Sequence, residues 1–505
     1  MGGFPTTSAS IAATTGSHDD LKDLVQEVFD EYITNEMPIR LLHITKHDQK
    51  TKFKLVDRAF VRNHFESVPD IIHGEFAQMM LVNGEDREDR IRERVKKELK
   101  YAIFSHRWLP GEQEPLYDHM SNQPMDIPDD PEPGWEKLQI FCRTAKDVHK
   151  CEFAWSDTCC IDKKSSAELD ESIRSMFRWY RNSYICIAFL SETADLAALQ
   201  MQEKGERGEK ARIDAWFIRG WTLQELLAPS QIKFYGSHWK PLIQGSTNDR
   251  DSEAIMRKIS ELTDIHMNDL ISFTPGTDRV PEKMLWASRR RTTRIEDIAY
   301  CLIGIFDISL MIAYGEGNRA FFRLLEEILK RYDKWDVFLW SGRCSRYNAA
   351  LPNAPHCYAA GCTETLPSAV DEIGDRRFAL TNHGLEIRVL LLAVQVEDIT
   401  EELPDSRCLS FRHDYFRVKV RHIGPKRERR DTAWAIGVLD YRVDGEDGSI
   451  DRSGKIPFTG FLLSSDAHAS PHLAATARWK KEMTKEVIKI CCPDHVPEHP
   501  TLLYL

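Results

Sequence analysis

Two spacings of apolar residues alternate along the first half of the chain. Apolar residues at every third or fourth position predict helices, and unbroken apolar runs such as YICIAFL at 184–190 predict strands that are covered on both faces. The predicted helices span 19–35, 85–100 and 135–149, with further helices opened by a capping box at Ser165 and Glu168 and beginning near Trp216. The predicted strands span 38–44, 101–104, 153–156, 184–190 and 232–235. Strands that alternate with helices predict an α/β fold on a parallel sheet.

The pattern changes twice in the rest of the chain. Residues 255–340 are predicted to be helical, most clearly at 294–306 and 319–332. From about residue 345 the period becomes two, and predicted strands lie at 385–394, 416–421, 434–441 and 458–463. We therefore predict three regions: a disordered tail and N-terminal helix at 1–36, an α/β domain with a helical extension at 37–340, and an antiparallel β-rich domain at 345–505.

Polar side chains follow several of the predicted strands in the α/β region. They are Ser105, His106, Arg107 and Trp108 after the strand at 101–104, Asp157–Asp162 after the strand at 153–156, and Ser191. Ligands of parallel sheets bind at the carboxyl ends of the strands, so these side chains are expected to gather on one edge in a loop region. A single histidine there is more often structural than an acid or base, and Asp157 could instead cap a helix.

Charge and composition restrict the function. The net charge is −11 and the pI about 5.9, which disfavours a nucleic-acid partner. The basic cluster at 426–430 is interpreted as a solvated loop. The sequence contains neither a G-x-G-x-x-G nor a Walker A motif, which disfavours a Rossmann dehydrogenase and a P-loop ATPase.

Cysteine usage and hydropathy favour a cytoplasmic protein with reduced thiols. The 12 cysteines follow no signal peptide, and no apolar run reaches the ~18 residues of a membrane helix. No metal is expected, because Cys357 and Cys362 lack a second pair of zinc ligands. Gly2 and Thr6 formally match a myristoylation pattern, and such short matches are often accidental. Cys159 and Cys160 are expected to pack, since no base for a nucleophile is marked.

Four segments together resemble the fungal heterokaryon incompatibility (HET) domain. They are YAIFSHRW at 101–108, WSDTCCIDKKSSAELDESIRSMFRWYRNSYICIAFLS at 155–191, WFIRGWTLQELLAP at 216–229, and RTTRIEDIAYCLIGIFDISLMIAYGEGNRAFFRLLEEI at 291–328. The resemblance covers roughly 100–330. It implies a protein of programmed cell death or of a non-self response.

A more distant resemblance is to TIR domains, which have a flavodoxin-like sheet. YAIFSHR resembles the first TIR strand and loop, and WTLQEL resembles the TIR pattern of Trp, Cys, two residues and Glu-Leu. Thr222 departs from that pattern, because TIR domains often have Cys there. The resemblance implies a TIR-like fold and assigns to Glu225 the role of the glutamate that is required to cleave nicotinamide from NAD.

The implied reaction gives several side chains candidate roles. NAD is then a substrate, and no cofactor is implied. Glu225 would stabilise the positive charge that develops on ribose, and Trp221 would stack on nicotinamide or simply pack. Arg107 and Arg219 could bind pyrophosphate through bidentate donors, although Arg219 could instead pair with Asp157 or Asp162.

Other functions stay open at this level. TIR resemblance implies self-association that completes the pocket, and partners could include other incompatibility or sensor proteins. The main alternative is a non-catalytic signalling module that acts through homotypic HET-domain contacts, with the Trp221 helix as an assembly surface. A third is a nuclease or cyclase-like activity on related substrates.

Overall fold

The structure is a computed structural model. It describes residues 18–47, 50–78, 86–111, 113–120, 132–199, 213–359, 378–403, 406–424, 432–441, 443–444, 449–450, 458–466, 479–491 and 500–505. The chain forms two compact units. Unit 1 comprises Met1–Ala188 and Pro229–Lys233, and unit 2 comprises Phe189–Ala228 and Phe234–Leu505. The predicted regions 1–36, 37–340 and 345–505 remain predictions of domain organisation.

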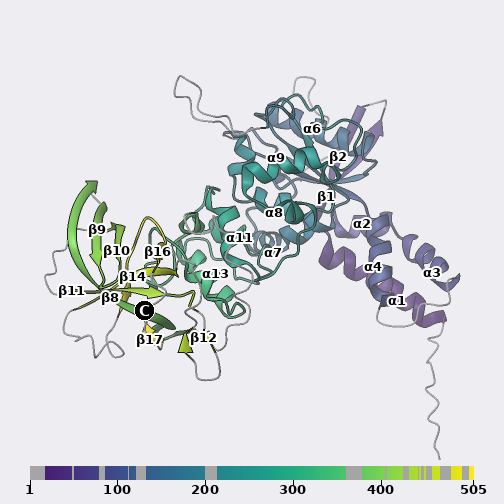
Figure 1. The fold of residues 1–505 in the computed structure, drawn as a ribbon. Coiled ribbons are helices and arrows are strands. Elements are labelled where there is room, and N and C mark those ends of the chain that lie inside the picture. Colours follow the sequence, from purple (N-terminus) through teal and green to yellow (C-terminus); the bar gives the residue numbers. More distant parts are fainter. Residues whose placement is uncertain are drawn as a thin grey trace, which may run out of the picture. The chain divides into compact units, whose positions relative to one another are not determined.

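A six-stranded sheet carries the α/β region (Figure 1). The strands are β1 (Arg40–His47), β2 (Lys50–Asp57), β3 (Tyr101–His106), β4 (Phe153–Trp155), β5 (Ile185–Phe189) and β6 (Ile232–Tyr235), in the order β2-β1-β4-β3-β5-β6. The pair β3 and β4 is parallel, whereas β1 is antiparallel to both β2 and β4. Every residue of β3, β4, β5 and β6 is buried, as the unbroken apolar runs predict.

The expectation of an all-parallel sheet was wrong at this edge. Strand β2 was not predicted, although its lysines alternate with Phe53 and Leu55 as in a half-buried strand. It continues from β1 as an antiparallel hairpin, with Arg40 opposite Asp57. Antiparallel neighbours can be joined by a short turn, so this edge needs no crossover helix.

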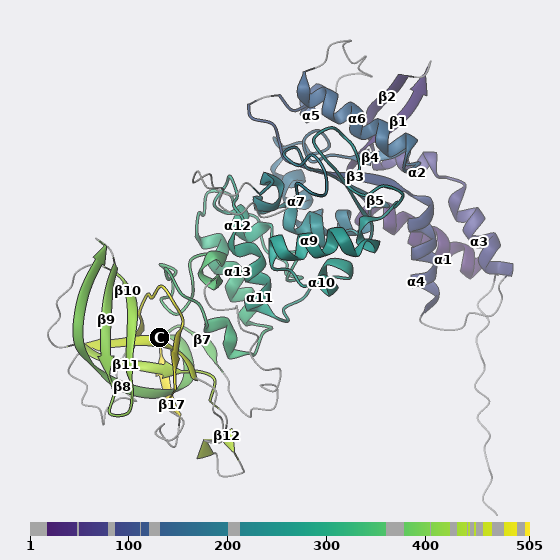
Figure 2. The same cartoon turned by 45° about the horizontal axis from the view of Figure 1, so that its top comes forward.

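Helices of unit 1 form two groups. Helix α6 (Pro133–Asp147) packs on β2 and β4, and its buried face includes Leu138, Phe141, Cys142 and Ala145. Helices α1 (His18–Glu31), α3 (Val68–Gln78) and α4 (Asp86–Glu98) pack on one another (Figure 2). The remaining elements are a π-helical turn η1 (Tyr32–Glu36), α2 (Arg58–His64), α5 (Tyr117–Met120) and α7 (Ser166–Asn182). The helices predicted at 19–35, 85–100 and 135–149 correspond to α1, α4 and α6.

The capping box at the start of α7 forms only in part. Oγ of Ser165 accepts a hydrogen bond of 3.4 Å from N of Glu168, as predicted. The Glu168 carboxylate does not return the bond to Ser165. It accepts from N of Asp162 at 2.8 Å and pairs with Arg40. The tertiary ion pair with β1 therefore takes the side chain that a local capping box would use.

Short helices make up the middle of unit 2. They are η2 (Ala215–Ile218), α8 (Thr222–Leu227), η3 (Asp249–Asp251), α9 (Glu253–Thr263), α10 (Met267–Ile271), α11 (Val280–Ser288), α12 (Asp297–Tyr300), α13 (Arg319–Leu329), η4 (Trp335–Phe338) and η5 (Pro355–Tyr358). Helix α13 confirms the helix predicted at 319–332. The helix predicted at 294–306 was wrong in length, because regular α-helix is confined to α12 and turns follow it.

The C-terminal part of unit 2 is an antiparallel sheet, as predicted, and its strands are curved (Figure 2). The path is β10-β9-β8-β11-β14-β15, with β16 paired to β14 and both β7 and β17 paired to β8. A cluster including Leu390, Phe411, Ile436 and Leu462 fills its core. The strands are β7 (Ala379–Thr381), β8 (Gly384–Leu403), β9 (Ser406–Arg412), β10 (Arg417–Ile423), β11 (Thr432–Val438), β14 (Phe458–Asp466), β15 (Lys480–Lys481), β16 (Ile488–Ile490) and β17 (Thr501–Tyr504), with a separate pair β12 (Val443–Asp444) and β13 (Ser449–Ile450).

Among the described helices, none combines the length and apolar character that crossing a membrane requires. Three features of the sequence lie outside the described residues: the match at Gly2 and Thr6, the basic cluster at 426–430, and Cys362.

Candidate functional site

Unit 1 brings three of the predicted site residues together where β3 and β4 end. Nε2 of His106 lies 3.4 Å from Oδ1 of Asp157, and the Trp108 indole donates a hydrogen bond of 2.9 Å to Oδ2 of the same carboxylate. Oγ of Ser156 lies 3.5 Å from Nε2 of His106. The parallel pairing of β3 with β4 explains the cluster, since it places the ends of both strands at one edge.

Ser105 and His106 are not loop residues, contrary to the prediction. They are the last two residues of β3, and both are buried. The His106 ring stacks on Phe104, with ring centroids 4.1 Å apart. Arg107 is the first exposed residue after the strand, and Trp108 is half-buried with Nζ of Lys163 at 3.8 Å from its ring centroid.

A buried ion pair lies beside His106. Lys137 of α6 pairs with Glu114, and its Nζ donates a bond of 3.2 Å to the carbonyl of Arg107. Burial lowers the pKa of His106, and the positive charge of Lys137 lowers it further, although Asp157 and Glu114 act in the opposite direction. His106 is therefore neutral near pH 7, and its Nε2 faces hydroxyl and carboxylate oxygens.

Unit 2 holds the residues that were singled out around Glu225. All six residues of α8 are buried, and Glu225 is 6% exposed. Trp221 immediately precedes the helix and is half-buried, and its carbonyl accepts a hydrogen bond of 3.4 Å from N of Glu225. The two side chains therefore share one helical face, as their spacing predicts.

The segment that leads into α8 is not a continuous helix, contrary to the prediction. It forms η2, breaks at Arg219 and Gly220, and resumes at Thr222. N of Gly220 donates to the carbonyl of Arg291 at 2.8 Å, and N of Arg291 donates to the carbonyl of Ile218. A Cβ on Gly220 would lie 2.5 Å from Cγ2 of Thr292, so this close approach requires glycine.

Arg290 anchors the start of α8. Its Nη1 donates hydrogen bonds of 3.0 Å to the carbonyl of Arg219 and 2.9 Å to Oγ1 of Thr222. Burial lowers the pKa of Arg290 to about 10, and the negative charge of Glu225 is among the groups that raise it again. Nη2 of Arg290 is buried without a hydrogen-bond partner in the described part of the chain, so one donor remains for another group.

Asp297 lies against Trp221. Its Oδ1 accepts a hydrogen bond of 2.9 Å from the hydroxyl of Tyr314. Burial raises the pKa of Asp297, whereas hydrogen bonds from Tyr314 and Trp221 lower it. The Asp297 carboxylate thus orients the indole that is predicted to stack on nicotinamide or simply to pack.

Sequence reasoning missed Arg290 and Asp297. Arg290 immediately precedes the fourth HET-like segment, and Asp297 lies within its first part, RTTRIEDIAY. That segment marked the region, but its sequence assigned no role to either residue. The backbone bridge between Arg219 and Arg291 brings Arg290 to the start of α8. Arg219 itself is half-buried. Its pairing with Asp157 or Asp162 and its role in binding pyrophosphate remain predictions.

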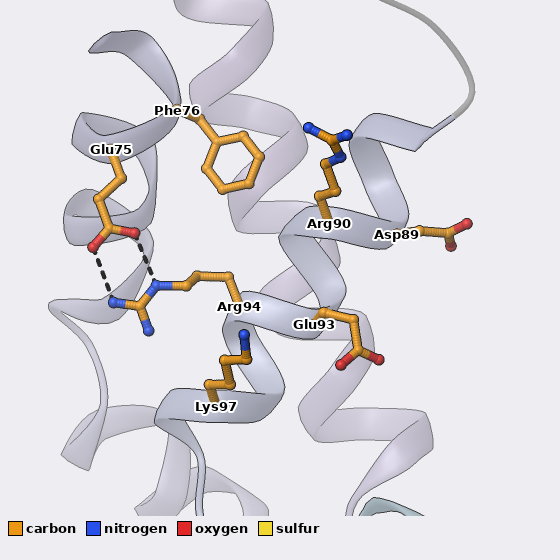
Figure 3. A pocket seen from close by; sticks show the side chains of 7 residues that line it. All are labelled: Glu75, Phe76, Asp89, Arg90, Glu93, Arg94 and Lys97. Carbon is orange, nitrogen blue, oxygen red and sulfur yellow. Dashed lines mark hydrogen bonds and ion pairs between the residues drawn. The ribbon is translucent and has the colours of Figure 1, made fainter. Parts of the chain in front are cut away.

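A charged pocket lies between α3 and α4 of unit 1 (Figure 3). It is lined by Glu75, Phe76, Asp89, Arg90, Glu93, Arg94 and Lys97. Nε of Arg94 lies 2.8 Å and its Nη2 2.9 Å from the two carboxylate oxygens of Glu75. This bidentate ion pair joins the two helices. It pairs the carboxylate of Glu75 with the guanidinium of Arg94, which is typical of a structural contact.

Comparisons with known proteins agree with the HET resemblance. The family model described as heterokaryon incompatibility protein (HET) matches residues 101–214. The vegetative incompatibility protein HET-E-1 of Podospora anserina is 38% identical over 233 residues, which are 46% of this chain and 16% of that relative. The chain thus spans well under two thirds of the relative's length. No solved structure shows significant similarity.

Proposed function

We propose that this chain, which carries a heterokaryon incompatibility (HET) domain, is a cell-death effector of a non-self response whose HET domain hydrolyses NAD at the nicotinamide–ribose bond. The name of the relative from Podospora anserina refers to vegetative incompatibility, which supports the cellular role. The observation that carries the chemical proposal is the burial of the Glu225 carboxylate within electrostatic range of the buried Arg290 guanidinium.

A buried carboxylate suits this reaction. When the C1′–N bond breaks, its electron pair leaves with the nicotinamide nitrogen and positive charge develops on ribose. Water then adds to C1′ and releases a proton, so the products are nicotinamide, ADP-ribose and H⁺. The leaving group departs neutral, and the main requirement is a fixed negative charge in a site that excludes water. Glu225 supplies that charge in this proposal.

Neighbouring groups support the role of Glu225. Trp221 shares its helical face and offers an aromatic surface for the nicotinamide ring, with Asp297 orienting the indole. The open donor on Nη2 of Arg290 suits a ribose hydroxyl or a phosphate oxygen. A TIR-like fold is part of the same proposal. It rests on the resemblance of WTLQEL to the TIR sequence pattern rather than on a matching structure.

The alternative function, a non-catalytic module that assembles through the Trp221 helix, fits this region less well. All six residues of α8 are buried, so the helix offers little surface for a second copy. Self-association is retained in the proposal through other surfaces. The substrate-binding roles of Ser105, His106, Arg107, Trp108, Asp157 and Arg219 are part of the proposal as well, with NAD as substrate and no further cofactor.

The test is nicotinamide release from NAD by the purified full chain over a range of protein concentrations. The Glu225→Gln variant keeps the shape of the side chain and removes its charge. We expect it to lower turnover roughly 10²- to 10³-fold, by analogy with other fixed electrostatic groups. Glu261→Gln is the matched control, because Glu261 is exposed on α9, and it should react like the wild type.

Two outcomes would contradict the enzymatic proposal. One is equal turnover by the wild type and a folded Glu225→Gln variant. The other is no turnover by the wild type even at concentrations at which it self-associates, which would favour the signalling module. Chromatography of the products distinguishes hydrolysis from a cyclase-like reaction, because hydrolysis yields linear ADP-ribose.

A further inference from the structure

Three side chains with metal-binding groups meet at one edge of the six-stranded sheet. His43 lies on β1, His64 is the last residue of α2, and Glu152 immediately precedes β4. One ligand atom from each lies within 4.8 Å of the others. Antiparallel pairing of β1 with β4 places His43 opposite Phe153, the neighbour of Glu152, so the sheet itself brings two of the three together.

The spacing of His64 and Glu152 matches that of two ligands of one tetrahedral ion. Nε2 of His64 lies 3.3 Å from Oε2 of Glu152. Two ligands at ordinary zinc distances of about 2.0–2.1 Å from one tetrahedral ion lie about 3.4 Å apart. Two histidines and one glutamate are also a donor set that zinc uses in sites that keep a fourth position for water. The side chains of His64 and Glu152 are 31% and 49% exposed, so water can reach that position.

Neighbouring side chains hold the three donors in place. The His43 ring stacks on Phe153 with centroids 5.1 Å apart, and the His64 ring meets the same phenylalanine edge-on at 5.2 Å. Nζ of Lys146 lies 2.6 Å from Oε1 of Glu152, which leaves Oε2 directed toward His64. Such outer contacts are typical of metal ligands, whose orientation is set by a second layer of groups.

The hydrogen bond between His64 and Glu152 does not explain why the His43 ring lies beside them. Nδ1 of His43 is buried and has no hydrogen-bond partner within the described ranges.

We propose that His43, His64 and Glu152 form a zinc-binding site that joins β1, α2 and the start of β4, with water in the fourth position. The site is independent of the proposed NAD chemistry. Its ligands are separated by long stretches of chain and follow no metal-binding motif, so their meeting depends on the fold.

The test uses the full chain, freed of affinity tags and of metal, titrated with zinc chloride in a calorimeter. The wild type should bind one zinc ion with a Kd in the micromolar range or tighter. His64→Gln and His43→Phe, which keeps an aromatic ring against Phe153, should each weaken binding roughly 10- to 100-fold or more. His383→Gln is the matched control, because His383 is exposed in the turn between β7 and β8, and it should bind like the wild type.

Cobalt substitution provides a second readout that needs no variant. Tetrahedral coordination of Co²⁺ by the wild type should produce intense visible absorption, and zinc should displace it. The proposal is overturned if the wild type binds no zinc below about 100 μM. A Kd weaker than that corresponds to a free energy of binding too small for a site with three protein ligands. The proposal is also overturned if folded His64→Gln and His43→Phe bind zinc like the wild type, or if bound Co²⁺ gives only the weak absorption of octahedral coordination.

Discussion

Nη1 of Arg290 lies 2.9 Å from Oγ1 of Thr222, the residue at which this chain departs from the TIR pattern. The same hydroxyl contacts the carbonyls of Trp216 and Arg219. It can therefore accept from the guanidinium and donate to a carbonyl at once. A thiol is a weaker donor and acceptor, so threonine suits a buried arginine better than the cysteine common in TIR domains.

Removing the Thr222 hydroxyl should destabilise the region around α8. Thr222→Val preserves shape and leaves a buried guanidinium with one acceptor fewer, so we expect the free energy of unfolding to fall by about 1–3 kcal/mol. Chemical denaturation measures the change. Thr263→Val is a control, because that half-buried hydroxyl bonds a carbonyl within its own helix, and it should cost less. Equal losses would indicate that the contact with Arg290 contributes little.

Adding a methyl group to Gly220 should separate the Trp216 segment from Arg291. In Gly220→Ala the new Cβ would lie 2.5 Å from Cγ2 of Thr292 and 3.2 Å from Sγ of Cys301. We expect a loss of about 1–3 kcal/mol in thermal or urea unfolding. Gly74→Ala should instead be neutral or stabilising by up to about 1 kcal/mol, since that Cβ meets nothing within 4 Å in helix α3. Similar losses for both variants would contradict the close approach as the cause.

Asp297 should act through Trp221 in the proposed reaction. Asp297→Asn keeps one acceptor oxygen for Tyr314 and Trp221 but removes the charge, and we expect kcat/KM for NAD to fall roughly 2- to 10-fold. Trp221→Phe should raise KM by a similar factor, because it keeps a ring and loses the indole N–H. Trp135→Phe, at another half-buried tryptophan, is the control. An Asp297→Asn variant with unchanged kinetics would limit Asp297 to a structural role.

The folded chain should lose stability as the pH is lowered, because of the buried side chain of His149. Burial, with a contribution from Lys233, lowers the pKa of His149 to about 4 from its ordinary 6.5. The unfolded chain therefore binds a proton that the folded chain does not bind between these values, so stability is highest above pH 6.5 and declines toward pH 4. We expect His149→Gln to remove up to about 3 kcal/mol of this pH dependence.

Urea denaturation between pH 7 and pH 4.5 measures the effect of His149. His383→Gln should leave the slope unchanged, since that side chain is exposed. A slope that is the same in His149→Gln and in the wild type would assign the pH dependence to other groups.

Much of the fold was predictable because its period is visible in short windows of the chain. The apolar run YICIAFL predicted β5, and the helical stripe after Ser165 predicted α7. Alternation at 416–421 predicted β10 within an antiparallel sheet. These elements bury one face or both, and burial imposes a spacing on the residues that compose them.

The sequence by itself determined the buried strands β3, β4, β5 and β6, the antiparallel C-terminal sheet and the grouping of Trp221 with Glu225, because all of these depend on spacings of a few residues. Only the tertiary structure decided that the segment at Gly220 breaks its helix, that Arg290 and Asp297 support α8 and Trp221, and that His43, His64 and Glu152 meet. Those contacts join residues that are far apart in the chain. Their partners are selected by packing and backbone pairing, which no local pattern records.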